Sequence, residues 1–189
     1  MMQVSASNST GGTAPAPIFL DVLDEKWLHA HNIRREEWHT RYGKTYVPLK
    51  WSNVLEAQAT AYAQDMLSTC GDVPVLGKTE YGKNLARNTG TGRWGSFRKP
   101  EDILIRWVDR EADFGWPGNA HLTQALWRAT KYVGCGVASK SWNDGNGMCH
   151  TQVCRYARPG NCNMAAYQSN QMLKDDSPCL PACPPDGNC

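Results

Sequence analysis

The chain has 189 residues, of which 20 are basic and 18 acidic, so its formal net charge is +2. That length suits one domain with tails and allows a substantial buried core, while the near balance of charge gives no bulk electrostatic reason to bind nucleic acid. No apolar run approaches the roughly 20 residues of a membrane-spanning helix, so we predict no transmembrane segment.

Eight cysteines, an even number, are many for a chain of this length. They predict disulfide bonds and an oxidising compartment; the alternative is buried free thiols in a cytosolic protein. The N-terminus contains no apolar stretch of the kind found in signal peptides. If the protein is secreted, we therefore expect its signal peptide to have been removed or to lie outside this sequence.

The first segment, residues 1–17, consists largely of Ser, Thr, Gly, Ala and Pro and offers almost nothing to bury. We predict that it is a flexible tail. Asn8-Ser9-Thr10 within it fits the acceptor pattern for N-glycosylation.

Apolar residues at helical spacing predict a first helix from Phe19 to Tyr42, ended by Gly43. Two of its histidines, His31 and His39, lie eight residues apart, which is about two helical turns and too far for them to share a metal ion directly. We therefore expect His31 to be a hydrogen-bonded core residue.

A second helix is predicted from Asn53 to Cys70, because Asn53 followed by Glu56 resembles a capping box and apolar residues then repeat at helical spacing. The stretch Gly71–Gly95 is predicted to be mostly loop, since it is rich in glycine. Pro100, followed by two acidic residues, marks the start of a third helix.

The stretch Asn119–Gly136 predicts a helix followed by a strand, with His121 in the first helical turn. We expect the side-chain oxygen of Asn119 to cap that helix. The turn-forming run Asn143–Gly147 then predicts an antiparallel hairpin whose second strand is Met148–Ala157. Residues 168–189 are polar and rich in proline, and we predict that this C-terminal extension is ordered only if disulfides bridge it.

Several motifs together carry a family resemblance. His121–Gln124, Trp127 and Gly134–Gly136 form a first motif, Val153–Asn161 forms a second, and Tyr81–Ala86 forms a shorter third. In this order they resemble the signatures of the CAP superfamily, which contains the cysteine-rich secretory proteins, the antigen 5 venom allergens and the plant pathogenesis-related class 1 proteins.

The resemblance extends from about Trp27 to Asn163 and implies an α+β fold. The expected architecture is a three-layer α–β–α sandwich with a small antiparallel sheet. It places a CAP domain at residues 18–167, between the tail and the extension, and it implies a secreted, extracellular protein.

The resemblance also implies part of the disulfide pattern. Cys135 is expected to pair with Cys154 and Cys70 with Cys149. The other four cysteines allow three pairings among themselves, and the sequence does not choose among them: Cys162, Cys179, Cys183 and Cys189.

Many members of the family hold two His and two Glu around a central cleft, and in some members these residues bind a divalent metal. Only His121 matches that set, because Lys83 and Arg110 stand where the resemblance places the two Glu and no histidine occupies the remaining position. Asp109 and Glu111 flank Arg110, so a shift of one residue in register would change this assignment.

From that assignment we predict that no metal or other cofactor is bound and that the cleft favours an anion held by Lys83, Arg110 and His121, since ammonium and guanidinium groups offer no lone pair. The alternative is that the two cations pair with neighbouring acids. Tyr81 and Gln124 lie in matched elements and are expected either to line the cleft or to brace it.

The resemblance implies a secreted, non-enzymatic protein that binds a sterol, a fatty acid, a small anion or an extracellular protein partner. One alternative is a hydrolase or protease-like protein, but no Ser/His/acid set can be assembled from the sequence; Ser96 and His121 are the nearest candidates. The other is an extracellular defence, virulence or reproductive signal acting through surface loops.

Overall fold

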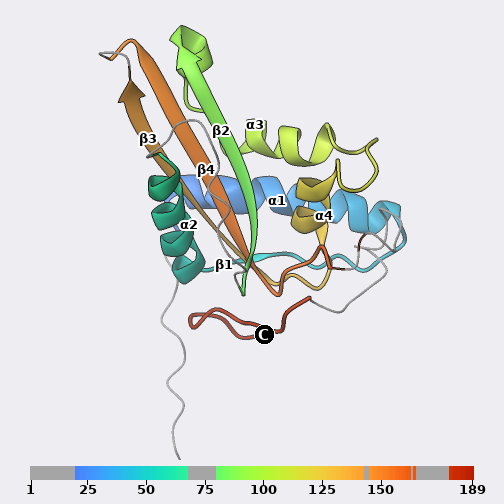
Figure 1. Cartoon of the computed structure of the whole chain (residues 1–189). Helices are drawn as coiled ribbons and strands as arrows, with labels where there is room; N and C mark the ends of the chain where they lie inside the picture. Colours follow the sequence, from blue (N-terminus) through green and yellow to red (C-terminus); the bar gives the residue numbers. More distant parts are fainter. Residues whose placement is uncertain (1–19, 68–79, 143–144, 163, 165–178) are drawn as a thin grey trace, which may run out of the picture.

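The computed structural model describes residues 20–67, 80–142, 145–162, 164 and 179–189. The tail with Asn8, and Cys70, lie outside these residues. Helices and strands follow one another along the chain (Figure 1) in this order: α1 Val22–Arg41, β1 Lys50–Trp51, α2 Asn53–Met66, β2 Gly82–Thr91, the short helix η1 Gly92–Gly95, α3 Pro100–Leu104, the π-helical turn η2 Ile105–Asp109, α4 Ala120–Leu126, β3 Tyr132–Trp142 and β4 Gly147–Ala157.

The described strands form one sheet in the order β1-β3-β4-β2. β3 and β4 are the predicted antiparallel hairpin, with Cys135 opposite Cys154. β2 pairs with the other side of β4, also antiparallel, but β1 runs parallel to β3. The sheet is therefore mixed, in contrast to the wholly antiparallel sheet that we expected, because the short strand before α2 enters in the same direction as β3.

The sheet lies between two helical layers, which confirms the three-layer α–β–α sandwich (Figure 1). α2 covers one face, where Tyr62 and Met66 pack against Ala138 and Val153. It approaches closely because β3 carries glycine there: a Cβ atom at Gly136 would lie 2.3 Å from the main-chain nitrogen of Thr60.

The opposite face carries α1, α3 and α4 and the larger core cluster, which includes Trp27, Trp107 and Trp127. Arg35 of α1 is fully buried there and donates to the carbonyl oxygens of Ala125, Trp127 and Thr130. Burial lowers the pKa of Arg35 to about 9. This side chain satisfies carbonyl groups in the last turn of α4 and just beyond it, which ties that helix to α1.

Two local expectations were wrong. The N-cap of α2 is Ser52, one residue before the predicted Asn53, and its hydroxyl accepts a hydrogen bond from the amide of Leu55. Gly82–Thr91, predicted as mostly loop, is a full edge strand, because β4 supplies a partner along its whole length. Its polar and glycine-rich sequence has little β-propensity of its own.

The C-terminal segment from Cys179 to Cys189 is stapled by two disulfides, Cys162–Cys179 and Cys183–Cys189. Its Asp186 accepts hydrogen bonds from the hydroxyl of Ser52 and the amide of Val54, at the N-terminus of α2. That the extension needs these bridges to be ordered stays a prediction. Among the described residues, no helix is long and apolar enough to cross a membrane.

Candidate binding site around His121 and Glu111

His121 lies at the N-terminal end of α4 and is hydrogen-bonded to Glu111. Its Nδ1 is 2.6 Å from the Glu111 Oε1, and the His121 side chain is 40% exposed whereas that of Glu111 is 11% exposed. The imidazole is therefore open to solvent on one side and held in place by a nearly buried carboxylate on the other.

Glu111 also caps α4. Its Oε2 accepts hydrogen bonds from the main-chain amides of His121 and Leu122, both at 3.1 Å. Asn119 occupies the N-cap position, but its side chain makes no capping bond, so the predicted cap was wrong. The carboxylate of Glu111, which precedes α4 in the chain, caps the helix in place of Asn119. Its negative charge lies at the positive end of the helix dipole.

The π-helical turn η2 explains why Glu111 and not Arg110 reaches the site. In η2 the amide of Arg110 bonds to the carbonyl oxygen of Ile105, five residues earlier. A π-helical turn holds one more residue than an α-helical turn, so every later side chain moves by one position. Arg110 is exposed and Glu111 turns inward, which corrects the predicted position of Arg110.

The His121 ring lies flat against Trp107, with 5.9 Å between ring centroids and 8° between planes. Trp107 in turn stacks on Trp27 and is almost fully buried. The remaining ring nitrogen of His121, Nε2, has no hydrogen-bond partner among the described residues. When the ring is neutral with its proton on Nδ1, this nitrogen presents a lone pair to solvent.

Of the other predicted cleft residues, Lys83 and Tyr81 lie away from His121. Lys83 donates from Nζ to the hydroxyl of Tyr62 on α2, on the sheet face opposite Asn84, because successive residues of a strand point to opposite faces. Tyr81 packs in the cluster beside the C-terminal segment and donates to the carbonyl oxygen of Cys183. The expected anion site of Lys83, Arg110 and His121 is therefore not assembled.

Gln124 is the one further predicted residue that stays near the site. It lies one turn after His121 on α4, is buried, and packs so closely on β2 that a Cβ atom at Gly82 would lie 2.2 Å from its Oε1. This contact corresponds to the bracing role that the sequence left as an alternative.

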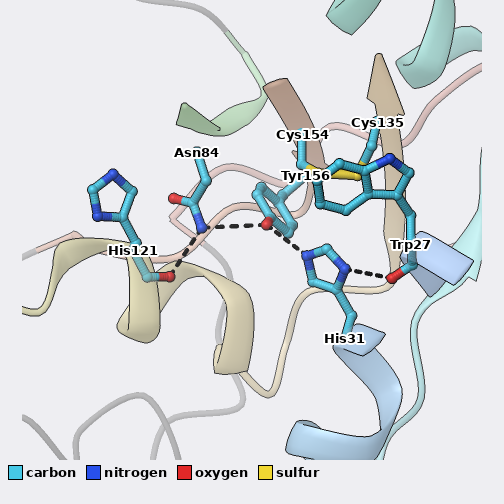
Figure 2. Close-up of a disulfide and its surroundings, with 7 residues drawn as sticks. All are labelled: Trp27, His31, Asn84, His121, Cys135, Cys154 and Tyr156. Carbon is cyan, nitrogen blue, oxygen red and sulfur yellow. Dashed lines mark hydrogen bonds between the residues drawn. A yellow bond between two sulfur atoms is a disulfide. The ribbon is translucent and has the colours of Figure 1, made fainter. Parts of the chain in front are cut away.

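Behind the site, a buried chain of hydrogen bonds joins His121 to His31 (Figure 2). Asn84 Nδ2 donates to the main-chain oxygen of His121 and to the Tyr156 hydroxyl, at 2.9 and 3.2 Å. The hydroxyl contacts Nε2 of His31 at 2.8 Å, and Nδ1 of His31 is 2.8 Å from the carbonyl oxygen of Trp27.

This chain fixes the protonation state of His31. A carbonyl oxygen can only accept, so Nδ1 carries the proton and Nε2 accepts from the Tyr156 hydroxyl. Burial lowers the pKa of His31 to about 4, helped by the nearby charges of Arg35 and Arg34. His31 is thus a neutral, hydrogen-bonded core residue, as expected from the sequence.

The described residues do not fit a divalent metal at this site. His121 offers one free nitrogen, and both oxygens of Glu111 already accept hydrogen bonds. The one described trio of His, Cys and acidic residues close enough to share an ion is His31, Cys135 and Cys154. The two cysteines of that trio form the expected disulfide (Figure 2). The reason to predict no metal is therefore a shortage of ligands and not repulsion by Lys83 and Arg110.

The Cys70–Cys149 disulfide remains a prediction. Cys149 is buried and has no disulfide partner among the described residues, and Cys70 lies outside them.

The nucleophile candidate Ser96 is also not placed with His121. Its hydroxyl donates to the carbonyl oxygen of Arg93 at 2.6 Å, within the segment that follows β2. A nucleophile needs a base within hydrogen-bond reach, and this pair does not meet that condition.

A cavity of about 320 Å³ opens between α1 and η2. Arg34 lines it and forms ion pairs with Glu101 and Asp109, at 2.6 and 2.7 Å. These pairs join α1 to the segment that carries Glu111, which gives the cavity a structural explanation.

Comparison with known proteins agrees with this architecture. The family model described as "Cysteine-rich secretory protein family" (CAP) matches residues 28–156. Pathogenesis-related protein 1A1 of Solanum lycopersicum is 32% identical over 154 residues, which covers 80% of this chain and 81% of the relative. Pathogenesis-related protein 1B of Nicotiana tabacum is 29% identical over 145 residues, covering 72% and 76%.

Among solved structures, MpPR-1i superposes with a TM-score of 0.55 at 22% identity, covering 74% of this chain and 89% of that one. At that identity the likeness shows the shared fold. The matched motifs, the family model and the sandwich agree, and the chain belongs to the CAP family of cysteine-rich secretory proteins.

Proposed function

We propose that this protein is a secreted, non-enzymatic CAP domain that binds a small apolar ligand carrying a hydroxyl group, of the sterol class, at His121. The observation that carries the proposal is the half-exposed imidazole, which lies flat on Trp107 and is oriented by Glu111. Small-molecule sites depend on a few precisely placed polar atoms, and this imidazole supplies one, because Glu111 and the buried ring of Trp107 fix its orientation.

The hydrogen-bonding capacity of the site favours an alcohol over the other ligands considered. With Nδ1 bonded to Glu111, Nε2 of the neutral ring is an acceptor, and a sterol hydroxyl has a proton to donate. A fatty-acid carboxylate at neutral pH has none. A small anion loses support because Lys83 and Arg110 lie elsewhere.

Secretion is supported by family membership and by the three described disulfides, which persist in oxidising compartments. Two observations support a non-enzymatic function. Both oxygens of Glu111 are engaged, one in capping α4 and the other in holding His121, and the Ser96 hydroxyl is bonded to the carbonyl oxygen of Arg93 and not to a histidine.

Binding of the fluorescent sterol dehydroergosterol tests the proposal, with labelled palmitate as the competing lipid class. We expect saturable sterol binding that weakens at least about tenfold in His121→Ala, the loss of one hydrogen bond to a well-placed ring. His29→Ala is the matched control, because His29 is exposed on α1, and it should bind like the wild type. Absence of saturable sterol binding, or equal loss in both variants, would contradict the proposal.

A further inference from the structure

The segment that follows β2 exposes two aromatic side chains at one end of the sheet. We call residues 92–99 the η1 loop. Trp94 is 66% exposed and Phe97 is 41% exposed. The loop lies at the opposite end of β2 from the C-terminal segment (Figure 1), so it is well separated from the part of the fold that the disulfides of that segment fasten.

The carbonyl groups of this loop are bonded to buried or partly buried side chains of the sheet. Asn88 Nδ2 donates to the carbonyl oxygens of Trp94 and Ser96, at 2.7 and 2.8 Å. His150 Nε2 lies 2.7 Å from the carbonyl oxygen of Gly95, which can only accept, so Nε2 carries the proton. His150 Nδ1 then accepts from the hydroxyl of Ser139 at 2.5 Å.

Two more carbonyls of the loop are satisfied in the same way. The hydroxyl of Ser96 donates to the oxygen of Arg93, and Gln152 Nε2 donates to the oxygen of Arg98 at 2.8 Å. The carbonyl oxygens of five loop residues thus already accept a hydrogen bond within the protein: Arg93, Trp94, Gly95, Ser96 and Arg98.

Internal satisfaction of these carbonyls matters for what the loop can contact. Displacing the water that is hydrogen-bonded to a main-chain carbonyl costs free energy unless another donor replaces it. For the same reason, a backbone that enters a lipid layer must have its polar groups hydrogen-bonded within the protein. Here the displacement of water costs little, because the hydrogen bonds remain in place.

The loop is also held in one conformation while its aromatic rings stay outside. Gly95 approaches Gly90 so closely that a Cβ atom at Gly95 would lie 2.3 Å from the Gly90 oxygen. Phe97 touches His150 edge-on, with ring centroids 6.0 Å apart. A rigid loop pays little ordering entropy when it meets a partner.

Basic residues predominate in the loop and in β2 before it, and the nearest acidic residues in the sequence, Glu101 and Asp102, follow the loop at the start of α3. Residues 81–100 contain no aspartate or glutamate, and they contain five basic residues: Lys83, Arg87, Arg93, Arg98 and Lys99. Three of these lie in the loop itself, next to Trp94 and Phe97. Tryptophan favours the interface between lipid and water, and each basic residue near an anionic lipid surface adds about 1 kcal/mol of attraction.

We infer that the η1 loop docks this protein onto the surface of a membrane containing anionic lipid, with Trp94 and Phe97 entering the interface and Arg93, Arg98 and Lys99 contacting lipid phosphates. The satisfied carbonyls, the exposed rings and the basic flank point to this partner together. The inference does not depend on the His121 site, which lies on α4.

Co-sedimentation with vesicles tests the inference, using phosphatidylcholine with phosphatidylserine against phosphatidylcholine alone. We expect the protein to bind the anionic vesicles and to be released by salt. The double variant Trp94→Ala/Phe97→Ala should lower the partition coefficient at least about tenfold, through lost apolar burial. Arg93→Gln and Arg98→Gln should each lower it about fivefold, on anionic vesicles only.

Phe114→Ala is the matched control, because Phe114 is 56% exposed but lies between Asp113 and Gly115, outside the basic segment. It should bind like the wild type, and unchanged melting curves should show that all variants fold. Failure of the wild type to bind anionic vesicles would overturn the inference. So would binding that survives Trp94→Ala/Phe97→Ala, or a dimer in sedimentation analysis that this double variant abolishes.

Discussion

His31 and His121 stand on the two sides of one hydrogen-bonded chain, and their surroundings differ in almost every respect (Figure 2). His31 is 1% exposed, and both ring nitrogens are bonded within the core. The His121 side chain is 40% exposed, and Glu111 holds one nitrogen while the other faces outward. The chain joins the His31 ring to the main-chain oxygen of His121, so it steadies the site without using the second imidazole.

The comparison shows that burial decides which histidine is available for binding. Removal from water lowers the pKa of His31 to about 4 and leaves no lone pair unused, so His31 serves the fold. His121 keeps an accessible nitrogen because its partner is a single carboxylate at a helix end. A residue of the same type thus has a structural role on one side of Asn84 and a proposed binding role on the other.

The largest expected effect comes from removing each ring in turn. We expect His31→Ala to lower the free energy of unfolding by about 2–4 kcal/mol, because it leaves a cavity and takes away the acceptor of the Tyr156 hydroxyl. We expect His121→Ala to cost less than about 1 kcal/mol, since the side chain is partly exposed and the change removes one hydrogen bond, to Glu111. Urea unfolding of the two variants measures the difference. Equal losses would contradict the division of roles.

The pH dependence of stability sharpens the same comparison. The pKa of His31 is about 4 in the folded protein against 6.5 for the free group. Between about pH 4 and pH 6.5, His31 is protonated in the unfolded chain but stays neutral in the folded protein, so lowering the pH favours unfolding. The contribution of His31 is complete above about pH 6.5 and is lost as the pH falls toward 4, by about 3 kcal/mol in total.

Urea unfolding across this pH range checks the prediction. His39 is buried and its pKa is also lowered to about 4, so the wild type should lose stability through both groups. In His31→Gln the free energy of unfolding should fall less steeply with decreasing pH, because one of the two buried histidines is gone. His29→Gln, at an exposed position, should show the pH dependence of the wild type. An unchanged slope in His31→Gln would show that His31 is not the neutral core group described above.

A smaller effect is expected at the carboxylate that orients His121. Glu111→Ala removes the cap of α4 and should cost about 1–2 kcal/mol. Glu111→Gln keeps an oxygen that can accept from the amides of His121 and Leu122 and should cost less. Glu37→Ala, which breaks only an exposed pair with Arg41, should cost about 0.3–0.5 kcal/mol. Thermal melting ranks the three, and a Glu111→Ala loss no larger than that of Glu37→Ala would argue against the cap.

The smallest effect is expected for Arg110, which the structure places outside the site. Arg110→Ala should change the free energy of unfolding by no more than about 0.5 kcal/mol and should leave sterol affinity unchanged. Urea unfolding and dehydroergosterol binding, the measurements proposed for His121→Ala, test this prediction. A clear loss of sterol binding would restore the register in which Arg110 faces the cleft.

The sequence carried the order of helices and strands because their apolar periodicity and turn residues are local signals. It placed the hairpin of β3 and β4 and, through the family motifs, the Cys135–Cys154 bridge. The family fold was likewise accessible from the motifs, since these extend over most of the chain.

The site could be predicted only in part, because its geometry depends on features without a local signal. No residue of Ile105–Asp109 is a helix breaker, so the sequence did not predict the π-helical turn that moves Glu111 into the site. The strand Gly82–Thr91 exists through pairing with β4, and that pairing puts Lys83 and Asn84 on opposite faces of the sheet. Glu111 was identified as a neighbour of the expected position, but the choice required the structure.

The most direct test of the account is nitrogen-resolved NMR of the histidine rings during titration with dehydroergosterol. We predict that the ring nitrogens of His31 show a proton on Nδ1 and do not shift, because both remain bonded in the core. The Nε2 resonance of His121 should shift saturably as the sterol hydroxyl binds, while its Nδ1 stays bonded to Glu111. A His121 ring that is silent to the sterol, or a His31 ring that responds in its place, would contradict the account.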